Sequence, residues 1–470
     1  MNTPQQPRGK RTVRDTEGIE YQLTERLAEG GQGVVYRTAY PRVLLKLSRK
    51  PMADARVREW FSHVCWVARQ PLEGMHIVKP VALIDSKHNP GYVMELMDGL
   101  EPVGTMLEQS MLALQEGRGL ADYQASGGIA RRVRLLARLA RLLADLHGRG
   151  LAYGDLSPAN ILVSQSIKHD EVWLIDSDNI SVSTREGGQK IHSPQFGAPE
   201  IMRGISGINS LTDSWSFGVL AFQLMTMLHP FKGDMVDEDA EREEQALCGH
   251  LPWIDHPDER QNACSVGLPR TDLLTIRLRA LFEQCFNPGR DEPGERPTMA
   301  TWAEGFEAAV TLLAECDPDE GCGNSFLFNP RAQCAFCDAV LPANAYTLLR
   351  HAVFAPVALL GDEATSKDQW IPTQDLQLLQ APHEVVLRAA PVGTAAYPAS
   401  PEVCRLQLDE SGLRFTPTTV LPVYLARGNG GELLKLTKPF LFTRAAQAAS
   451  IASLHIGHPA SVHAVWRFKW

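Results

Sequence analysis

Apolar and polar positions divide the chain into a strand-rich beginning, a helical middle and a strand-rich end. Short apolar runs bounded by turn residues, such as Arg42–Leu47 and Gly91–Gly99, are typical of buried strands. One helix is predicted between them, from about Ala53 to Arg69. Its apolar residues recur at helical spacing at Val57, Phe61, Val64 and Ala68.

The middle of the chain is dominated by helical periodicity. A leucine stripe between Leu135 and Leu146 predicts a long buried helix, and we interpret its arginines, Arg131, Arg134, Arg138 and Arg141, as a solvated face. We also predict a helix from Met106 to Gln115, an exposed acidic helix start within Asp234–Glu244, and a last helix from Met299 to Ala314.

The final region, Leu341–Trp470, has a different texture. Alternating residues such as Val403–Leu408, with turns at Glu410–Gly412 and Gly428–Gly431, predict a small β-sandwich or barrel. Since it carries no recognisable chemistry, we assign it a binding or regulatory role.

Composition narrows the class of protein. A formal net charge of −9 over 470 residues argues against general nucleic-acid binding. No window approaches about 18 uninterrupted apolar residues, so no membrane span is expected. The polar start, residues 1–18, is predicted to be disordered and lacks the apolar core of a secretory signal. We therefore expect a cytoplasmic protein whose nine cysteines stay reduced.

The most informative stretch is Tyr153–Leu162, followed by Trp173–Asp176. Asp155, Asn160 and Asp176 have the spacing of a kinase catalytic constellation. Phosphoryl transfer needs a positioned hydroxyl and divalent ions that neutralise charge on the phosphates. Asp155 would accept or orient the substrate hydroxyl, while Asn160 and Asp176 would hold Mg²⁺ through oxygen atoms.

A glycine-rich turn precedes this constellation. Gly30, Gly31 and Gly33, with Val35 at the start of the next strand, can lay backbone N–H groups over phosphates. Lys46, ten residues after Tyr36, lies in an apolar strand, where it would contact the α- and β-phosphates. The alternative is a plain β-hairpin followed by an edge-strand lysine with its ammonium in water.

A buried lysine needs a carboxylate partner. Glu59 on the predicted helix is the natural candidate for Lys46, and Glu73, in a loop beyond Pro71, is the fallback.

Together these residues make the chain resemble the eukaryotic-like bacterial Ser/Thr protein kinases. Later landmarks strengthen the resemblance: Phe196–Glu200, Asp213–Gly218 and Glu295–Thr298 follow in the family's order. The resemblance implies a buried ion pair between Glu200 and Arg296.

The resemblance also implies the architecture and the nucleotide site. It implies an α+β, bilobal fold with an N-lobe over about 19–97 and a helical C-lobe over about 98–314. ATP and Mg²⁺ would be the cofactors and a protein the substrate. Glu95 and Met97 would bind the adenine edge through their backbones, and Met94 would guard the pocket behind it.

Several positions depart from the family pattern. Ala28 replaces the first glycine, Tyr153-Gly154 replaces His-Arg, and the D-F-G triplet is Asp176-Ser177-Asp178. Ser157, which we include in the catalytic set, stands where a lysine usually neutralises the γ-phosphate. Two alternatives therefore stay open: a pseudokinase or nucleotide-binding scaffold, and an interaction protein that works through its C-terminal parts.

Four cysteines, Cys316, Cys322, Cys334 and Cys337, fall within 22 residues after the last predicted kinase helix. Two knuckles separated by a short apolar strand are what a tetrahedral zinc-thiolate site needs, so residues 315–340 are predicted to form a zinc-ribbon-like module. The alternative is four reduced, partly buried thiols, and His351 is a spare ligand if Cys316 points away.

The order kinase, four-cysteine module and β-rich domain at 341–470 resembles, more loosely, a bacterial kinase group. Those kinases are encoded beside von Willebrand A-type proteins and type 2C phosphatases in tellurite-resistance-like clusters. This resemblance implies stress or defence signalling, with those two proteins as partners.

Overall fold

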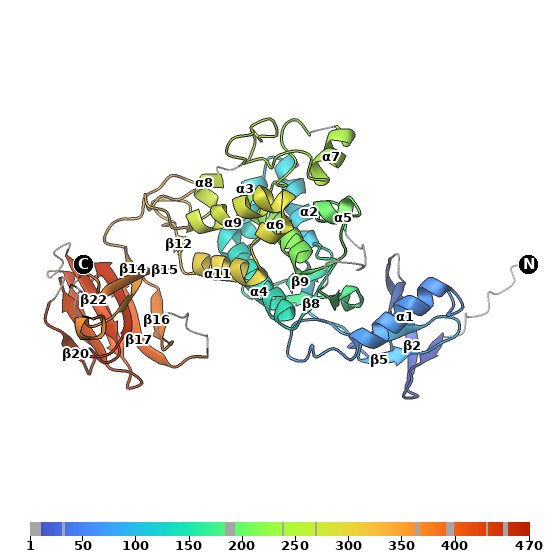
Figure 1. Cartoon of the computed structure of the whole chain (residues 1–470), viewed down its shortest axis with the longest axis horizontal. Helices are drawn as coiled ribbons and strands as arrows, with labels where there is room; N and C mark the ends of the chain where they lie inside the picture. The colour runs from blue at the N-terminus through green and yellow to red at the C-terminus, as the bar shows by residue number, and fades with distance from the viewer. Residues whose placement is uncertain are drawn as a thin grey trace, which may run out of the picture. The chain divides into compact units, whose positions relative to one another are not determined.

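The computed structural model describes residues 11–30, 33–183, 193–236, 239–267, 270–361, 365, 367–391, 399–428, 431–444 and 450–470. The chain forms two compact units (Figure 1). The first comprises Met1–Arg270 and Ile276–Phe306, and the second comprises Thr271–Thr275 and Glu307–Trp470.

The first unit begins with a six-stranded antiparallel sheet in the order β1-β2-β3-β4-β6-β5. Its strands are β1 (Thr12–Arg14), β2 (Glu20–Glu29), β3 (Val34–Thr38), β4 (Val43–Leu47), β5 (Ala82–Ile84) and β6 (Gly91–Glu95). Both faces of β4 are covered, because Leu45 packs with Val93 on one side and Leu44 packs with Val64 on the other. A continuous apolar strand is therefore stable here, and it carries Lys46 into the interior.

The predicted disorder of residues 1–18 needs a correction. Residues 1–10 lie outside the described part, but β1 pairs with β2 through Thr12↔Gln22 and Arg14↔Glu20. Asp15 is buried and accepts a hydrogen bond from the Tyr21 hydroxyl at 2.8 Å. The sequence of this segment is polar, but its backbone and its carboxylate both find partners in the sheet.

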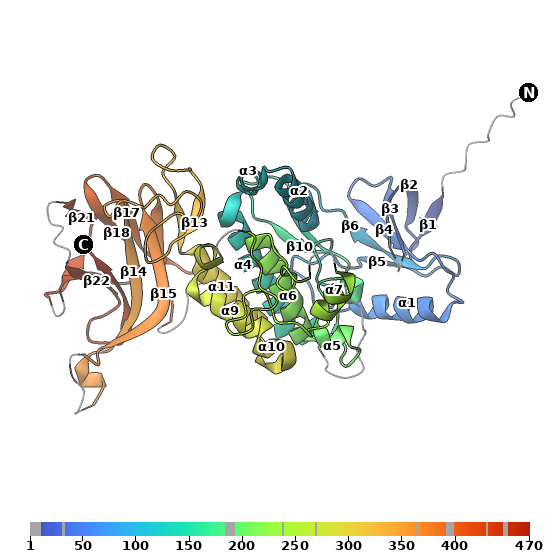
Figure 2. The same cartoon turned by 90° about the horizontal axis from the view of Figure 1, so that it is seen from above.

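The single helix of this lobe, α1 (Ala55–Val67), covers one face of the sheet (Figure 2). The Asp54 side chain caps it by accepting a hydrogen bond from the Arg56 N–H. Val57, Val64 and Val67 form its buried stripe. The predicted helix at 53–69 is confirmed, and the observed helix is two residues shorter at each end.

Helices make up most of the rest of the first unit. They are α2 (Val103–Gln115), α3 (Gly119–Ala125), α4 (Gly128–Gly148), α5 (Pro199–Met202), α6 (Ser210–Thr226), α7 (Ala240–Leu247), α8 (Arg270–Leu273), α9 (Ile276–Phe286), α10 (Pro288–Asp291) and α11 (Met299–Val310). Two of them cross the boundary between the units, because α8 after Arg270 and α11 after Phe306 consist of residues of the second unit. The predicted extra helix at 106–115 is confirmed as α2. The acidic run ends in the exposed start of α7, where Asp239 is the N-cap; residues 237 and 238 lie outside the description.

The arginines of α4 do not all face solvent, so that interpretation was wrong in part. Arg134 and Arg138 are exposed, but Arg131 is buried and donates to the carbonyls of Ser126 and Ser164. Buried carbonyls at chain turns need donors, and a long arginine side chain can reach them from the helix. Of the helices described, none combines the length and apolar character needed to cross a membrane.

Short strands hold the segments of the candidate site. They are β7 (Leu100–Pro102), β8 (Leu151–Ala152), β9 (Ile161–Ser164), β10 (Val172–Leu174) and β11 (Ser181–Val182), with 3-10 turns η1 (Ser177–Asn179) and η2 (Pro293–Glu295). β10, β9 and β7 form one small sheet, and β11 pairs with β8. The loop between β8 and β9 and the turn η1 are therefore fixed at both ends.

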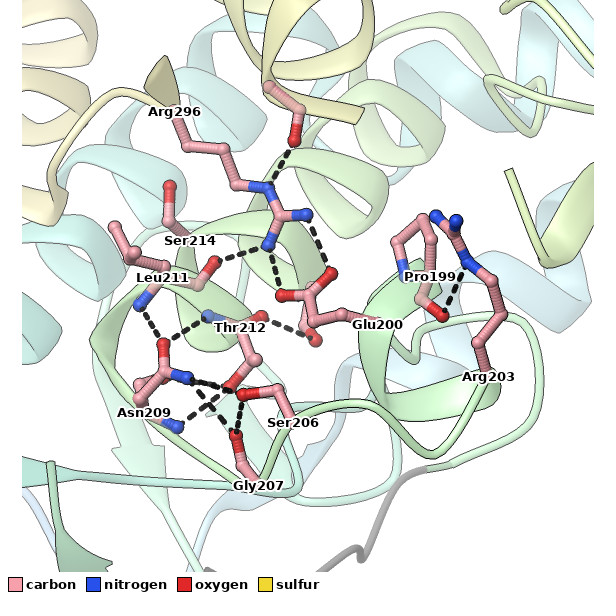
Figure 3. Close-up of polar contacts among 12 residues, drawn as sticks. Pro199, Glu200, Arg203, Ser206, Gly207, Asn209, Leu211, Thr212, Ser214 and Arg296 are labelled. Carbon is pink, nitrogen blue, oxygen red and sulfur yellow. Dashed lines mark hydrogen bonds and ion pairs between the residues drawn. The ribbon is translucent and has the colours of Figure 1, made fainter. Parts of the chain in front are cut away.

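A buried ion pair ties two distant parts of the helical region together (Figure 3). Arg296 donates from two nitrogens to the two carboxylate oxygens of Glu200, each at 2.8 Å. Arg296 also donates to the carbonyls of Leu211 and Gly289, and its guanidinium lies over the Trp215 ring. The predicted Glu200–Arg296 pair is confirmed, and all three guanidinium nitrogens donate hydrogen bonds.

The second unit is a β-sandwich. One antiparallel sheet has the order β15-β14-β23-β22-β19-β20 and the other the order β16-β17-β18-β21. Their strands are β14 (Tyr346–Phe354), β15 (Trp370–Gln380), β16 (Glu384–Arg388), β17 (Glu402–Asp409), β18 (Gly412–Pro417), β19 (Val423–Arg427), β20 (Leu434–Leu436), β21 (Phe440–Thr443), β22 (Ile451–Ile456) and β23 (His463–Lys469); a 3-10 turn, η3 (Val357–Leu359), follows β14. Leu349 and Leu454 of one sheet share a core with Leu406 and Phe415 of the other, so of the two predicted forms the sandwich is the observed one.

Before the sandwich, β12 (Leu313–Glu315) pairs with β13 (Ser325–Leu327). The last helix predicted at 299–314 therefore ends earlier, at Val310. Ala314 is buried in β12 and packs with Phe326, a contact between residues distant in sequence that helical periodicity does not reveal.

Two histidines form a buried hydrogen-bonded chain inside the sandwich. The Ser453 hydroxyl lies 3.1 Å from His455 Nε2, and His455 Nδ1 lies 2.8 Å from His463 Nε2. His463 Nδ1 lies 2.7 Å from the Ser461 carbonyl and donates to it, which leaves Nε2 as an acceptor for His455. Burial, with His463 nearby, lowers the pKa of His455 to about 4.

We predict that replacing Arg296 with Met lowers the free energy of unfolding by about 3–5 kcal/mol, because Glu200 is left buried without its partner. Chemical denaturation followed by tryptophan fluorescence measures this. The control is Arg203→Met. Arg203 is an exposed arginine that directly follows α5, the helix that carries Glu200, and in Figure 3 its side chain contacts only the Pro199 carbonyl. Equal stability of the two variants would contradict the prediction.

We also predict that the second unit loses stability as the pH falls from 6.5 towards 4. In that window the unfolded chain protonates His455 while the folded chain, whose pKa is about 4, does not. The loss reaches at most about 3 kcal/mol. Urea unfolding at pH 7 and pH 4.5 measures it, and His455→Gln should flatten the dependence while His383→Gln, at an exposed position, should not. Identical pH dependence in all three proteins would contradict the assignment.

Candidate active site

The loop between β8 and β9 presents Asp155 and Asn160 on one side. The Asn160 amide donates to the Asp155 carbonyl at 2.9 Å and to its carboxylate oxygen Oδ2 at 3.1 Å. The Ser157 carbonyl accepts from the Asn160 N–H and closes the turn. Asp155 is thereby oriented, and its other carboxylate oxygen, Oδ1, points to a neighbouring hydroxyl.

Asp213 of α6 holds the backbone of this loop by hydrogen bonds. Its carboxylate accepts hydrogen bonds from the backbone N–H groups of Tyr153 at 2.6 Å and Gly154 at 2.8 Å. His147 of α4 is a third partner, at 2.9 Å. Because α6 is almost entirely buried, the loop is anchored to the core of the unit.

The Tyr153-Gly154 departure has a structural cause. Gly154 has a φ of +92°, and a Cβ there would lie 2.8 Å from Ile208 Cδ1 and 3.0 Å from the Asn179 carbonyl oxygen. An arginine at this position would be strained. The buried Tyr153 hydroxyl donates to the Ile175 carbonyl, which joins the loop to the end of β10.

Asp176 follows β10 in a left-handed conformation, with φ 54° and ψ 46°. The Ile175 N–H donates to the Asn160 carbonyl, so the Asn160 and Asp176 segments are adjacent. Burial raises the pKa of Asp176, and Lys46 opposes this effect. These two oxygen-bearing side chains are placed where Mg²⁺ could be held, as the sequence predicts.

Lys46 projects from β4 towards the same place. Its Nζ donates to both carboxylate oxygens of Asp178 at 3.0 Å and lies 3.3 Å from Asp176 Oδ1. Burial favours the neutral amine, but the two carboxylates outweigh it and raise the pKa of Lys46. The lysine is therefore a fully charged, buried group.

The predicted pairing of Lys46 with Glu59 was wrong. Glu59 is exposed on α1, and Trp60, one residue on, faces the site instead. Neighbouring helix residues point about 100° apart, so the register of α1 decides which one enters. The fallback, Glu73, pairs with Lys79 in an exposed loop.

The other residues that the sequence predicts to bind the nucleotide lie on the strands next to Lys46 and in the loops that adjoin them. Gly30 donates its N–H to the Gly33 carbonyl, which closes the glycine turn, and Val35 lies opposite Lys46 in the β3–β4 register. Gly31 lies outside the described residues. Met94 is buried in β6, Glu95 ends that strand, and Met97 follows it half-buried.

Ser193 supplies the hydroxyl next to the catalytic carboxylate. Its Oγ donates to Asp155 Oδ1 at 2.8 Å. Two residues later the Gln195 carbonyl accepts from the ring of the buried His229, at 3.1 Å. Gln195 also lines a pocket of about 540 Å³, together with Met111, Asp234 and other residues.

The four predicted zinc ligands come together in the second unit. The sulfurs of Cys316 and Cys337 are 3.5 Å apart, those of Cys322 and Cys334 are 3.7 Å apart, and all four lie within 4.8 Å of one another. Zinc–thiolate bonds of 2.3 Å in a tetrahedron require sulfurs about 3.8 Å apart, so the geometry fits.

His351 is not part of the cysteine cluster, and because Cys316 points into the cluster, no spare ligand is needed. It lies in β14, where its Nδ1 contacts the Thr373 hydroxyl at 2.9 Å.

The sequence did not reveal three of the groups that build the active site. From the sequence, Asp178 was recognised only as part of the departure from D-F-G and Asp213 only as a family landmark, and Trp60 was not singled out. The charge of Asp178 beside Asp176 was a usable signal, because a second buried carboxylate needs a cationic partner.

Comparisons with known proteins agree with this geometry. The Protein kinase domain family matches residues 21–304. The serine/threonine-protein kinase pkn3 of Myxococcus xanthus is 34% identical over 311 residues, which are 64% of this chain and 51% of the relative. Pkn2 of the same organism is 29% identical over 129 residues, 26% of this chain and 15% of the relative. PksC of Streptomyces coelicolor is 26% identical over 242 residues, 48% of this chain and 40% of the relative.

The chain thus spans about half of the length of these curated relatives, or less. The family match nevertheless covers more than half of the chain. It includes β3 to β6 and nearly all of β2 from the six-stranded sheet, the Asp155 loop and the Arg296 ion pair described above. This protein belongs to the protein kinase domain family.

Proposed function

We propose that the chain is a Ser/Thr protein kinase that transfers the γ-phosphate of ATP to hydroxyl groups of protein substrates. The observation that carries the proposal is the convergence of Asp155, Asn160, Asp176 and Lys46 from three separate segments: the loop between β8 and β9, the turn after β10, and β4. All of them are held by hydrogen bonds or ion pairs that suit phosphoryl transfer.

The chemistry assigned to each residue follows from its surroundings. Asp155 Oδ1 already accepts a hydrogen bond from the Ser193 hydroxyl, which is the interaction that a substrate hydroxyl would make. The buried, fully charged Lys46 would bind phosphate oxygens. Asn160 and Asp176 would hold Mg²⁺, which when bound neutralises phosphate charge. Glu95 and Met97 would meet the adenine, with Met94 behind it.

A protein substrate fits better than a small molecule. The pocket that begins at Gln195 lies two residues along the chain from Ser193, which contacts Asp155. Its lining combines apolar side chains, Leu107 and Met111 among them, with the acidic Asp234 and Glu243. A peptide with side chains on either side of the phosphorylated residue can use such a surface.

A pseudokinase is the second candidate, and one observation favours it. Ser157 is buried where the family has a lysine, so one positive charge near the γ-phosphate is missing. The retained carboxylates and Lys46 support activity, and the next experiment decides between the two.

We predict that Asp155→Asn lowers autophosphorylation and the phosphorylation of a generic protein by about 10²–10⁴-fold, because the positioned base is lost. Asp176→Ala should abolish both while binding Mg²⁺-ATP less tightly than the wild type. Incorporation of labelled phosphate and circular dichroism measure activity and fold. Wild-type incorporation in both folded variants would exclude this mechanism, whereas ATP binding without turnover in the wild type would establish a pseudokinase.

We further propose that Cys316, Cys322, Cys334 and Cys337 hold a structural zinc ion. Two backbone N–H groups support this, since Cys322 N–H points to Cys316 Sγ and Phe336 N–H to Cys334 Sγ. Such contacts favour the thiolate form that zinc binds. The ion would supply folding energy to a segment with a small core of its own.

A cytoplasmic location and a role in stress or defence signalling are part of the same proposal. The location rests on the composition of the sequence, and the signalling role rests on the looser resemblance to kinases encoded with von Willebrand A-type proteins and type 2C phosphatases. Those two classes of protein would be a partner and an antagonist of the kinase.

We predict about one zinc per chain in protein purified without chelators, measured by elemental analysis. Cys334→Ser with Cys337→Ser should release the metal and unfold residues 315–340, seen as faster amide exchange, while the first unit keeps its stability. Cys264→Ser is the control, because that cysteine lies outside the cluster. Absence of metal from the wild-type protein would contradict the zinc site.

A further inference from the structure

Asp178 occupies a position in the site that the sequence reasoning gave to a helix glutamate. We propose that Asp178, the last residue of the Asp-Ser-Asp triplet, is the positioning residue for Lys46, in place of a carboxylate on α1. The proposal rests on the kinase function proposed above and assigns one further residue to it.

The Asp178 carboxylate is surrounded by donors from three different elements. Lys46 of β4 reaches both of its oxygens at 3.0 Å, and the Trp60 indole N–H of α1 donates to Oδ2 at 2.8 Å. The Tyr92 hydroxyl of β6 lies 3.3 Å from Oδ1. The Asp178 side chain is 0% exposed, and this many donors hold its carboxyl group in one orientation.

Lys46 depends on this carboxylate. Its side chain is only 6% exposed, and an ammonium at that depth is stable only beside negative charge. Asp176 also lies close, at 3.3 Å, but it carries the predicted Mg²⁺ role and is more accessible, at 34%. Asp178 has no comparable access to a ligand, which leaves it to hold the lysine.

The helix that would ordinarily supply the partner has none facing inward. Glu59 is the only acidic residue within α1 (Ala55–Val67), and it is exposed. α1 nevertheless packs directly against η1, the turn that contains Asp178. Trp60 makes the polar contact between them, so an indole N–H connects α1 to the lysine through Asp178.

This arrangement divides two tasks between two carboxylates. Asp178 holds Lys46 while Asp176 remains available to a metal ion. It also explains the triplet, because a side chain with a carboxylate is needed at a position where D-F-G has glycine. A displacement of α1 would act on Lys46 by removing the Trp60 hydrogen bond from Asp178.

The first test measures the charge state of Lys46 and needs no enzymatic activity. Trace acetylation of the full-length protein across pH, quantified by mass spectrometry of the Lys46 peptide, gives the pKa of that lysine. We expect Asp178→Asn to lower this pKa by about one unit or more, because a contacting negative charge is lost. Asp176 and the Tyr92 hydroxyl, the other titratable groups facing Lys46, remain in that variant.

Two comparison variants make the result specific. Asp85→Asn makes the same chemical change at an exposed carboxylate of the same lobe and should leave the Lys46 pKa unchanged. Glu59→Gln should leave it unchanged as well. A lowered pKa in Glu59→Gln would overturn the proposal even if Asp178→Asn failed to fold, and an unchanged pKa in folded Asp178→Asn would overturn it directly.

The second test is kinetic. Asp178→Asn should lower kcat by about 100-fold or more with a smaller change in the KM for ATP, and its rate should begin to fall at a lower pH on the alkaline side. Trp60→Phe, which removes only the N–H donor, should give a smaller loss of the same kind. A wild-type protein without activity would reject the proposed function while the acetylation result still decided the role of Asp178. Equal losses in Asp178→Asn and Glu59→Gln would reject the positioning role.

Discussion

The buried ammonium of Lys46 is the constraint on which the active site depends. β4 is covered on both faces, so its lysine cannot reach water and must meet carboxylates inside the protein. Asp176 and Asp178 meet it from the turn after β10, and Trp60 and Tyr92 complete the set of donors around Asp178. The N-terminal sheet, α1 and the turn η1 are thereby held around one charged cluster.

The helical part supplies the second fixed point. Asp213 of the buried helix α6 holds the backbone of the Asp155 loop, and Arg296 holds Glu200 just after the segment that carries Ser193. Both contacts are charge-assisted and buried, so they resist small displacements. The proposed base, the proposed Mg²⁺ ligands and the segment that carries Ser193 consequently share one scaffold.

The second unit is built on different chemistry. Its sandwich has an apolar core between two antiparallel sheets, and its N-terminal module has a small core beside four clustered thiols. A module with so few buried apolar residues needs a further source of stability, which the proposed tetrahedral metal site would provide. The cysteine cluster and the histidine chain of the sandwich are the polar features that distinguish this unit from a plain sandwich.

The sequence by itself determined the local chemistry and much of the architecture. Motif order placed Lys46, Asp155, Asn160 and Asp176, periodicity placed α1 and α2, and the Glu200–Arg296 pair followed from landmarks of the family. Tertiary structure alone decided that Asp178, and not a carboxylate on α1, meets Lys46. Neighbouring helix residues point about 100° apart, so the register of α1 turns Trp60 rather than Glu59 towards the site. It also decided that Arg131 is buried and that Ala314 belongs to a strand. In each case the outcome depended on a partner distant in sequence, which no local pattern encodes.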